Sequence, residues 1–173
     1  TEMAKRIAQF FKVSYEQYKE AYQDTYGDVS EEEIREVYDS IKLPKRATSG
    51  SAGYDFYAPV AITLEPGKTV KVPTGIRAKM EDNWVLKLYP RSGLGFKYRL
   101  QLNNTVGIID SDYYYSDNEG HIFAKITNDS NEGKTVEIAE GTGFMQGIFI
   151  EYGITLDDDV TDVRNGGSGS TTK

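Results

Sequence analysis

Between Val13 and Gly27, hydrophobic and aromatic residues recur every three to five positions, the spacing of one face of an α-helix. This stripe consists of Val13, Tyr18, Ala21, Tyr22 and Tyr26. Ser14 and Gln17 form a capping-box pattern at its start, and Gly27 provides a C-terminal stop. The pattern therefore predicts a capped amphipathic helix.

A second helix is predicted directly afterwards. Ser30 and Glu33 repeat the capping box, acidic residues fill the first turn, where the helix dipole favours them, and Pro44 ends the pattern. The apolar stripe of this helix is Ile34, Val37, Tyr38 and Ile41. A shorter helix is expected over Met3 to Phe11. We therefore expect an N-terminal helical extension over residues 1–42.

From Pro44 onward, β-branched and aromatic residues alternate with polar ones in short runs, separated by turn signals such as Glu65-Pro66-Gly67. The expected strands include Ala61 to Leu64, Thr69 to Val72, Gly75 to Met80, Val85 to Tyr89, His121 to Thr127, Thr135 to Ile138 and Gln146 to Tyr152. Many short strands at regular spacing are typical of a sandwich or barrel. The expected fold class is therefore mainly β, with one β domain over residues 43–156.

The end of the chain has a different composition. Residues 157–173 begin with acidic side chains, continue with glycine, serine and threonine, and contain too few apolar side chains to fold alone. We expect this segment to act as a flexible C-terminal lid.

Composition restricts the chemistry that the chain can perform. Acidic residues outnumber basic ones by 27 to 20, and the net charge of −7 argues against the broad basic surface that non-specific nucleic-acid binding requires. The chain has no cysteine and only one histidine, His121, to which we assign a structural role. Carboxylates, backbone amides and a hard cation such as Mg²⁺ remain. Without a membrane-spanning run of about 20 apolar residues or a secretory signal, we expect a cytoplasmic protein.

Five polar, glycine-rich segments follow one another through the β-patterned region. They are Ala52-Gly53-Tyr54-Asp55, Pro90-Arg91-Ser92-Gly93, Asn104 to Tyr113, Gly141 to Gln146 and Arg164 to Thr171. Together they supply carboxylates, groups for binding an anion and a glycine-rich tail, which are the residues needed to handle a phosphorylated small molecule. Their order resembles the homotrimeric dUTPase family from about Leu43 onward. The resemblance implies a distorted jelly roll and Mg²⁺-dependent hydrolysis of dUTP to dUMP and pyrophosphate.

Asp110 is the first catalytic candidate. It follows Gly107-Ile108-Ile109, so a strand delivers one carboxylate just before a turn, where it can orient and deprotonate a water. The resemblance implies that role and a bond to the sugar 3′-hydroxyl, whereas an aspartate at this place can also simply cap the turn. Gln146 is expected to bond the catalytic water or an α-phosphate oxygen. Asp55 is expected to hold a water of the Mg²⁺, which binds mainly through the substrate phosphates.

Asn104, Gly107 and Tyr113 are expected to bind the base and the sugar. The Asn104 amide can both donate and accept, as uracil requires, and the resemblance assigns the base to it together with the backbone of a following hairpin, which includes Gly107. The resemblance also implies that the Tyr113 ring packs against C2′ and excludes a ribose hydroxyl. An insert over residues 114–120 lengthens this hairpin, as in Gram-positive bacterial versions of the family.

Two segments are expected at the phosphates. Arg91, Ser92 and Gly93 would bind phosphate oxygens through a guanidinium, a hydroxyl and a closely approaching backbone at the start of a helix. In the tail, Arg164 would bring positive charge to the γ-phosphate as an arginine finger. Further tail residues expected at the substrate are Gly166, Gly167, Ser168 and Ser170.

The chain departs from the family pattern at two positions. Gly143 stands where the family normally has an arginine, so the role of that arginine is not carried over. Ser168 stands where an aromatic ring usually stacks over the uracil. Losing stacking of ~1 to 3 kcal/mol would weaken lid closure by roughly tenfold or more. We therefore hypothesise a lid-impaired form with reduced turnover.

The resemblance implies a homotrimer in which three subunits share three active sites. One subunit would contribute the segment from Asn104 to Tyr113, a neighbour Arg91 and Ser92, and a tail Arg164. The substrate and product would be dUTP and dUMP, with no nucleic-acid or membrane partner.

Two alternatives remain open. A dCTP deaminase is related in fold, but its equivalent segment typically has Asp-Pro-Gly-Trp where this chain has Asp110 to Tyr113, and it needs a glutamate farther along. A nucleotide-sensing or protein-binding module is the other alternative, in which the two helices from Ser14 to Ile41 contact a protein partner. Packing on the trimer is the more ordinary use of such helices.

Overall fold

The computed structural model describes residues 3–164 of the 173-residue chain. Its helices are α1 (Tyr15–Tyr26), α2 (Glu31–Ser40), α3 (Ser92–Tyr98) and the 3₁₀ helix η1 (Ser111–Tyr115). Its strands are β1 (Ala8–Lys12), β2 (Lys45–Arg46), β3 (Tyr54–Tyr57), β4 (Ile62–Leu64), β5 (Thr69–Pro73), β6 (Ile76–Met80), β7 (Trp84–Pro90), β8 (Leu100–Leu102), β9 (Gly107–Asp110), β10 (Phe123–Asn128), β11 (Val136–Ile138) and β12 (Gly143–Glu151).

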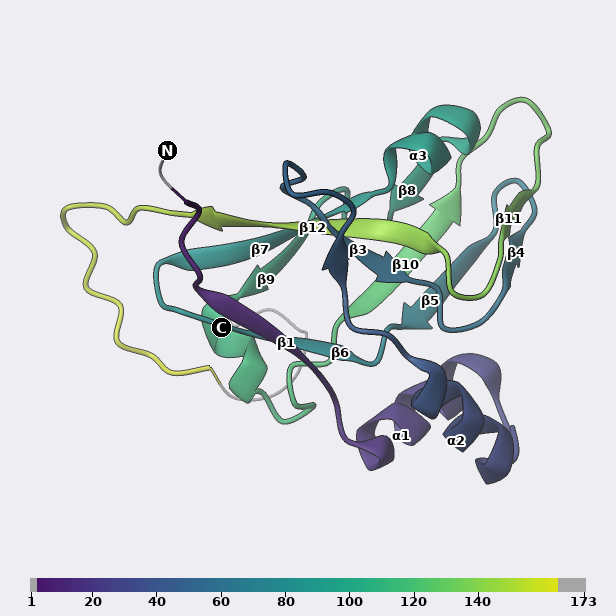
Figure 1. Ribbon diagram of the computed structural model, residues 1–173, viewed down its shortest axis with the longest axis horizontal. Helices are drawn as coiled ribbons and strands as arrows, with labels where there is room; N and C mark the ends of the chain where they lie inside the picture. The colour runs from purple at the N-terminus through teal and green to yellow at the C-terminus, as the bar shows by residue number, and fades with distance from the viewer. Residues whose placement is uncertain (1–2, 165–173) are drawn as a thin grey trace.

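Antiparallel pairing organises these strands into several sheets. A five-stranded sheet has the order β2-β3-β12-β7-β9, and a three-stranded sheet has the order β5-β10-β8. The remaining pairs are β1-β6 and β11-β4. Figure 1 shows the long strands β7 and β12 side by side, in agreement with their continuous register. The structure confirms the mainly β fold class predicted from the sequence.

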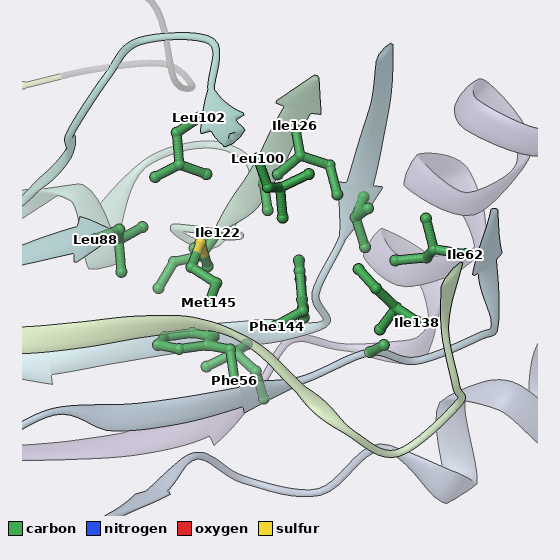
Figure 2. Packing of buried hydrophobic residues seen from close by; sticks show 14 of the residues in the cluster. Phe56, Ile62, Leu88, Leu100, Leu102, Ile122, Ile126, Ile138, Phe144 and Met145 are labelled. Carbon is green, nitrogen blue, oxygen red and sulfur yellow. The ribbon is translucent and has the colours of Figure 1, made fainter. Parts of the chain in front are cut away.

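A single large core lies between the sheets. Buried residues alternate with more exposed ones along β10 and β6, as expected for strands with one face on a core. Figure 2 shows side chains from five strands converging in this core: Phe56, Leu88, Leu100, Ile126 and Phe144. The predicted strands are confirmed, most within two residues of the predicted ends, although β12 begins three residues earlier than predicted, at Gly143.

Both predicted helices are confirmed with their caps. The Ser14 hydroxyl accepts a hydrogen bond from the Gln17 amide (3.2 Å), and the Ser30 hydroxyl accepts one from the Glu33 amide (3.2 Å). Gly27 ends α1 with a φ of 79°. The two helices lie together at one end of the molecule, beside β5 (Figure 1).

The tyrosine-rich stripe of the helices faces inward. It forms a second apolar cluster made of Val13, Tyr15, Tyr18, Tyr22 and Ile34. A hydrogen bond from the Thr25 hydroxyl to the Lys71 carbonyl (2.8 Å) ties α1 to β5. The stripe therefore packs the helices onto the β domain.

The prediction of a short helix over Met3 to Phe11 is wrong. Ala8–Lys12 forms strand β1, which pairs with β6 and places Phe10 opposite Ala78. The buried Phe10 ring lies within 5.6 Å of the rings of Tyr54, Phe56 and Phe149, measured between centroids. Burying this ring among three others outweighs the small helix propensity of a short segment without caps.

None of the helices in the described range has the length and apolar character that crossing a membrane would require.

Candidate active site

A cleft of about 360 Å³ opens at the edge of the five-stranded sheet, next to β9 and η1. Its walls consist of Leu88, Leu102, Asn104, Gly107, Ile108, Ile109, Asp110, Tyr113, His121, Phe123, Lys125, Met145 and Arg164. Five of the residues predicted from the sequence to bind substrate or activate water are among them: Asn104, Gly107, Asp110, Tyr113 and Arg164. The structure therefore brings the third and fifth sequence segments together.

Asn104 lies in a tight turn between β8 and β9. The Thr105 amide donates to the Leu102 carbonyl (2.8 Å), the Val106 amide donates to the Asn104 carbonyl (2.8 Å), and Thr105 has a positive φ of 69°. These bonds leave the Asn104 side chain exposed on the cleft wall. An amide that can donate and accept is thus available where the sequence predicts base recognition.

The segment around Asn104 is not the two-stranded hairpin expected from the sequence. β8 pairs with β10, and β9 pairs with β7, so the chain crosses from one sheet to another at this turn. The crossing requires Gly107, because a Cβ there would lie 2.9 Å from the Leu88 Cβ. Gly107 therefore lets β9 approach β7 closely and form the floor of the cleft.

Tyr113 is held at both ends. Its ring is buried on the cleft wall within η1, and its hydroxyl donates to the His121 carbonyl (2.5 Å). The Asn118 side-chain amide donates to the same hydroxyl (2.9 Å). The ring therefore has a fixed position, which a group that limits the space around a sugar needs.

Asp110 and Asp112 share one guanidinium. Arg164 donates from Nη2 to the Asp110 carboxylate (2.7 Å) and from Nε to the Asp112 carboxylate (2.8 Å). The arginine side chain is 13% exposed, whereas each carboxylate is 53% exposed. In Figure 1 the segment after β12, drawn in yellow, loops outward and then turns back toward the β domain. Arg164 at the end of this segment binds the two carboxylates. Arg164, which the sequence predicts to bind the γ-phosphate, is therefore bound instead to Asp110, the predicted general base of the same chain.

A second cluster contains the other predicted polar residues. Asp55 on β3 pairs in register with Gln146 on β12, and the Arg91 guanidinium donates to the Gly143 carbonyl (3.2 Å). A Cβ on Gly143 would lie 3.4 Å from the Asp55 Cβ and 3.6 Å from the Arg91 guanidinium. In this chain Arg91 thus brings positive charge beside Gly143 and Asp55, where the family pattern places another arginine.

Ser92 and Gly93 extend the second cluster. They form the first turn of α3, as predicted, and Arg91 is its N-cap residue. Both residues are exposed, and a Cβ on Gly93 would meet no atom of the described chain within 4 Å. These groups can therefore contact a ligand that approaches from outside the chain.

Within one chain, the cluster around Asp110 and the cluster around Gln146 lie at different positions along β7. Gln146 pairs with Tyr89 on β7, whereas Asp110 pairs with Val85, four residues earlier on the same strand. At about 3.4 Å per residue, this offset alone separates Asp110 from Gln146 by roughly 14 Å, and β7 lies between β12 and β9. Asp110 and Gln146 of a single chain therefore cannot contact the same water.

Within residues 3–164, no three histidine or acidic side chains are grouped so that they could hold a metal ion. The two carboxylates that do come together, Asp110 and Asp112, both bind Arg164. This donor set fits a cation that arrives with phosphate oxygens better than one held entirely by the protein.

His121 is a cleft residue that the sequence did not identify as one. Its buried Nε2 accepts from the Gly75 amide (2.9 Å), so the ring proton is on Nδ1, which donates to the Gln17 side-chain oxygen (2.9 Å). Burial, and to a lesser extent the positive charge of Lys71, lowers the pKa of His121 to about 3. The imidazole is therefore neutral. Its place on the cleft wall is evident only from its contacts with residues that lie far away in the sequence.

The family model described as dUTPase matches residues 39–172. The chain belongs to the dUTPase family. The deoxyuridine 5′-triphosphate nucleotidohydrolase of Lactococcus lactis subsp. lactis is 40% identical over 134 residues, which cover 76% of this chain and 88% of that protein.

Solved dUTPase structures match the fold. The dUTPase of Streptococcus mutans is 41% identical, with a TM-score of 0.58, and the match covers 65% of this chain and 88% of that one. A variant of the dUTPase from phage phi11 of S. aureus, described with a structural Mg(II) ion, is 19% identical, with a TM-score of 0.61 over 91% of this chain and 98% of that one. These matches confirm the jelly-roll fold expected from the resemblance.

Four predicted site residues of this dUTPase-family chain lie outside the described residues: Gly166, Gly167, Ser168 and Ser170.

Proposed function

We propose that the protein hydrolyses dUTP to dUMP and pyrophosphate. The observation that carries this proposal is the cleft, in which Asn104, Asp110 and Tyr113 form one wall of a pocket in a chain of the dUTPase family. In a space of about 360 Å³, the Asn104 amide can bind a base, the Tyr113 ring can pack against a sugar, and the Asp110 carboxylate can activate a water. Such removal of dUTP would limit uracil in DNA and supply dUMP.

Selectivity for the base and the sugar comes from fixed groups. The Asn104 amide and the backbone of its turn offer a donor and an acceptor to uracil, a pattern that cytosine does not match. The Tyr113 ring, held by its hydroxyl, lies where a ribose 2′-hydroxyl would lose its water without gaining a partner. That loss costs about 1 to 3 kcal/mol.

Asp110 activates the attacking water. Its carboxylate lies at the end of β9, exposed to the cleft, and can accept the water proton. Because Arg164 binds this carboxylate in the free chain, the arginine must leave before the proton can be accepted. A triphosphate in the cleft would compete for the guanidinium, so substrate binding itself would free the base and place Arg164 on a phosphate.

The complete site forms between subunits of a homotrimer. The offset along β7 prevents Asp110 and Gln146 of one chain from reaching one water. A neighbouring subunit would therefore supply Arg91, Ser92 and Gln146 to the cleft that contains Asp110. This arrangement also explains why Ser92 and Gly93 are exposed and have room for a ligand.

Mg²⁺ would enter with the substrate. Bound to the phosphates, it would neutralise part of their charge during the displacement of pyrophosphate. Asp55 is half-buried beside Gly143 and would hold one of its waters.

Ser168 would make the lid less effective than in relatives with an aromatic residue at that position. We therefore expect turnover that is slow for the family, with the fold and the reaction unchanged.

The test is incubation with Mg²⁺ and, separately, dUTP, dCTP, dTTP and UTP, followed by anion-exchange chromatography of the products. We expect conversion of dUTP alone to dUMP and pyrophosphate. Ammonia released from dCTP would indicate a deaminase, and no product from any nucleotide would favour a binding module.

Two matched variants test the role of Asp110. Asp110→Asn and Asp112→Asn each remove the negative charge from one of the two side chains that bind Arg164. Asp110→Asn should lower kcat by roughly 10²-fold to 10⁴-fold, whereas Asp112→Asn should change it much less. Equal losses would mean that both residues act only by holding Arg164.

A further inference from the structure

We infer that helix α1 is a positioning element of the sugar site, acting through Gln17 and His121 on Tyr113. The inference rests on the proposed function, in which the Tyr113 ring meets the sugar. It assigns to the helical arm, residues 13–41, a part in substrate selection by the same chain.

Two contacts clamp the start of α1 to the loop that follows Tyr113. Glu119 accepts hydrogen bonds from the Ser14 amide (2.7 Å) and the Ser14 hydroxyl (2.6 Å). His121 donates from Nδ1 to the Gln17 side-chain oxygen (2.9 Å). The loop residues Glu119 and His121 are thus held by two residues on the same turn of one helix.

At the start of α1 the capping box is incomplete, because the Gln17 side chain does not bond the Ser14 amide. In an ordinary box the Gln17 side chain would return to the Ser14 amide. Glu119 already bonds that amide, so the Gln17 side chain is available to His121. This exchange links the helix to the loop at two points in place of a contact within the helix.

His121 carries the connection from the helix to the cleft. Its fully buried ring is fixed on one side by the Gly75 amide and on the other by Gln17. The ring also lies against Phe123, with 4.3 Å between centroids. Because both ring nitrogens are bonded and the ring is packed, the backbone of residue 121 has little freedom to move.

The same residue holds Tyr113. The His121 carbonyl accepts the hydrogen bond from the Tyr113 hydroxyl, and Asn118 in the same loop donates to that hydroxyl. A shift of the loop would therefore move the ring that faces the cleft. Removing the acceptor on Gln17 would leave the Nδ1 proton of His121 buried without a partner, which favours such a shift.

Gln17→Met tests this connection, because methionine keeps the length of the side chain and replaces the amide oxygen with a thioether sulfur that is only a weak acceptor. Gln17→Glu keeps an acceptor. Gln23→Met is the matched control, since Gln23 is also half-buried on α1 and its side chain has no hydrogen bond in the described range. The assays are kcat and KM for dUTP and for UTP, and the melting temperature of each protein.

We expect Gln17→Met to lower the preference for dUTP over UTP, measured as the ratio of kcat/KM values, by roughly threefold to tenfold. Most of the change should be a higher KM for dUTP. Gln17→Glu and Gln23→Met should retain the wild-type ratio. If Gln17→Met does not fold, Glu119→Ala replaces it, because that change removes the other contact of the clamp and should lower the same ratio.

A lower melting temperature with an unchanged ratio would overturn the inference, since the helix would then only stabilise the fold. Wild-type protein that does not act on dUTP would contradict the proposed function, and this inference with it. Wild-type activity with an unchanged ratio in the variants would contradict the inference alone.

Discussion

The buried His121 should make the stability of this protein depend on pH in a range where few other groups titrate. Burial lowers the pKa of its imidazole to about 3, from 6.5 for an unperturbed histidine. In the unfolded chain the ring takes up a proton as the pH falls below about 6.5, whereas the folded ring stays neutral down to about pH 3. The contribution of neutral His121 to the unfolding free energy is therefore fully present above about pH 6.5 and is lost as the pH falls toward 3.

The magnitude follows from the two pKa values. Between about pH 7 and about pH 5, the unfolded state gains most of one proton per chain, and the linkage removes roughly 2 kcal/mol of unfolding free energy. Because aspartate and glutamate titrate mainly below about pH 5, the 27 acidic residues contribute little over that range. For a chain of this length, the loss corresponds to a fall of roughly 4 to 8 °C in melting temperature.

Thermal denaturation at fixed protein concentration, at several values of pH, measures this effect. His121→Gln is the comparison, because glutamine does not titrate and its oxygen can still accept the Gly75 amide proton. The melting temperature of the variant should be nearly constant over the range in which that of the wild type falls. Since His121 is the only histidine, its ring signals in ¹⁵N NMR also report the proton on Nδ1 directly. Parallel pH profiles of the two proteins, or a ring that becomes charged near pH 6, would refute the reasoning.

Three further changes test the packing, the helix cap and the lid. Gly107→Ala would place a Cβ 2.9 Å from the Leu88 Cβ and should cost about 1 to 3 kcal/mol of unfolding free energy in a denaturant titration; unchanged stability would show that β9 can move away from β7. Ser14→Ala removes the N-cap of α1 and a partner of Glu119, and should cost about 1 to 2 kcal/mol; a double-mutant cycle with Glu119→Ala that shows no coupling would contradict the observed contact. Ser168→Phe should strengthen nucleotide binding or raise kcat/KM by roughly tenfold, and unchanged kinetics would refute the lid hypothesis.

Local sequence patterns predicted the elements of this fold because the decisive interactions are short in range. The caps at Ser14 and Ser30 bond amides three residues away, and the strands follow the alternation of buried side chains. The β1 strand was missed because its stability comes from distant residues. Phe10 packs on Phe56 and Phe149, and nothing within the segment from Met3 to Phe11 indicates those partners.

The contents of the cleft were predictable for a related reason. Asn104, Gly107, Asp110 and Tyr113 lie within ten consecutive residues, so one turn, one short strand and one 3₁₀ helix suffice to bring them together. The partners of His121 lie far from it in the sequence, 104 residues away for Gln17 and 46 for the Gly75 amide. A residue whose role depends on such contacts has no local signature, and a single histidine is therefore easily taken as a simple core residue.

The relation between Asp110 and Gln146 depends on strand register, which the order of motifs does not contain. A register in which both residues paired with the same position on β7 would leave only the two strand spacings across β7 between them, about 10 Å. The observed register adds an offset of four residues along that strand, so one chain does not bring Asp110 and Gln146 to the same water. Under the proposed function, association of subunits would be needed to bring the general base Asp110 to the phosphate-binding residues. The exposed Arg91 and Ser92 and the exposed carboxylate of Asp110 are the surfaces that such an association would bring together.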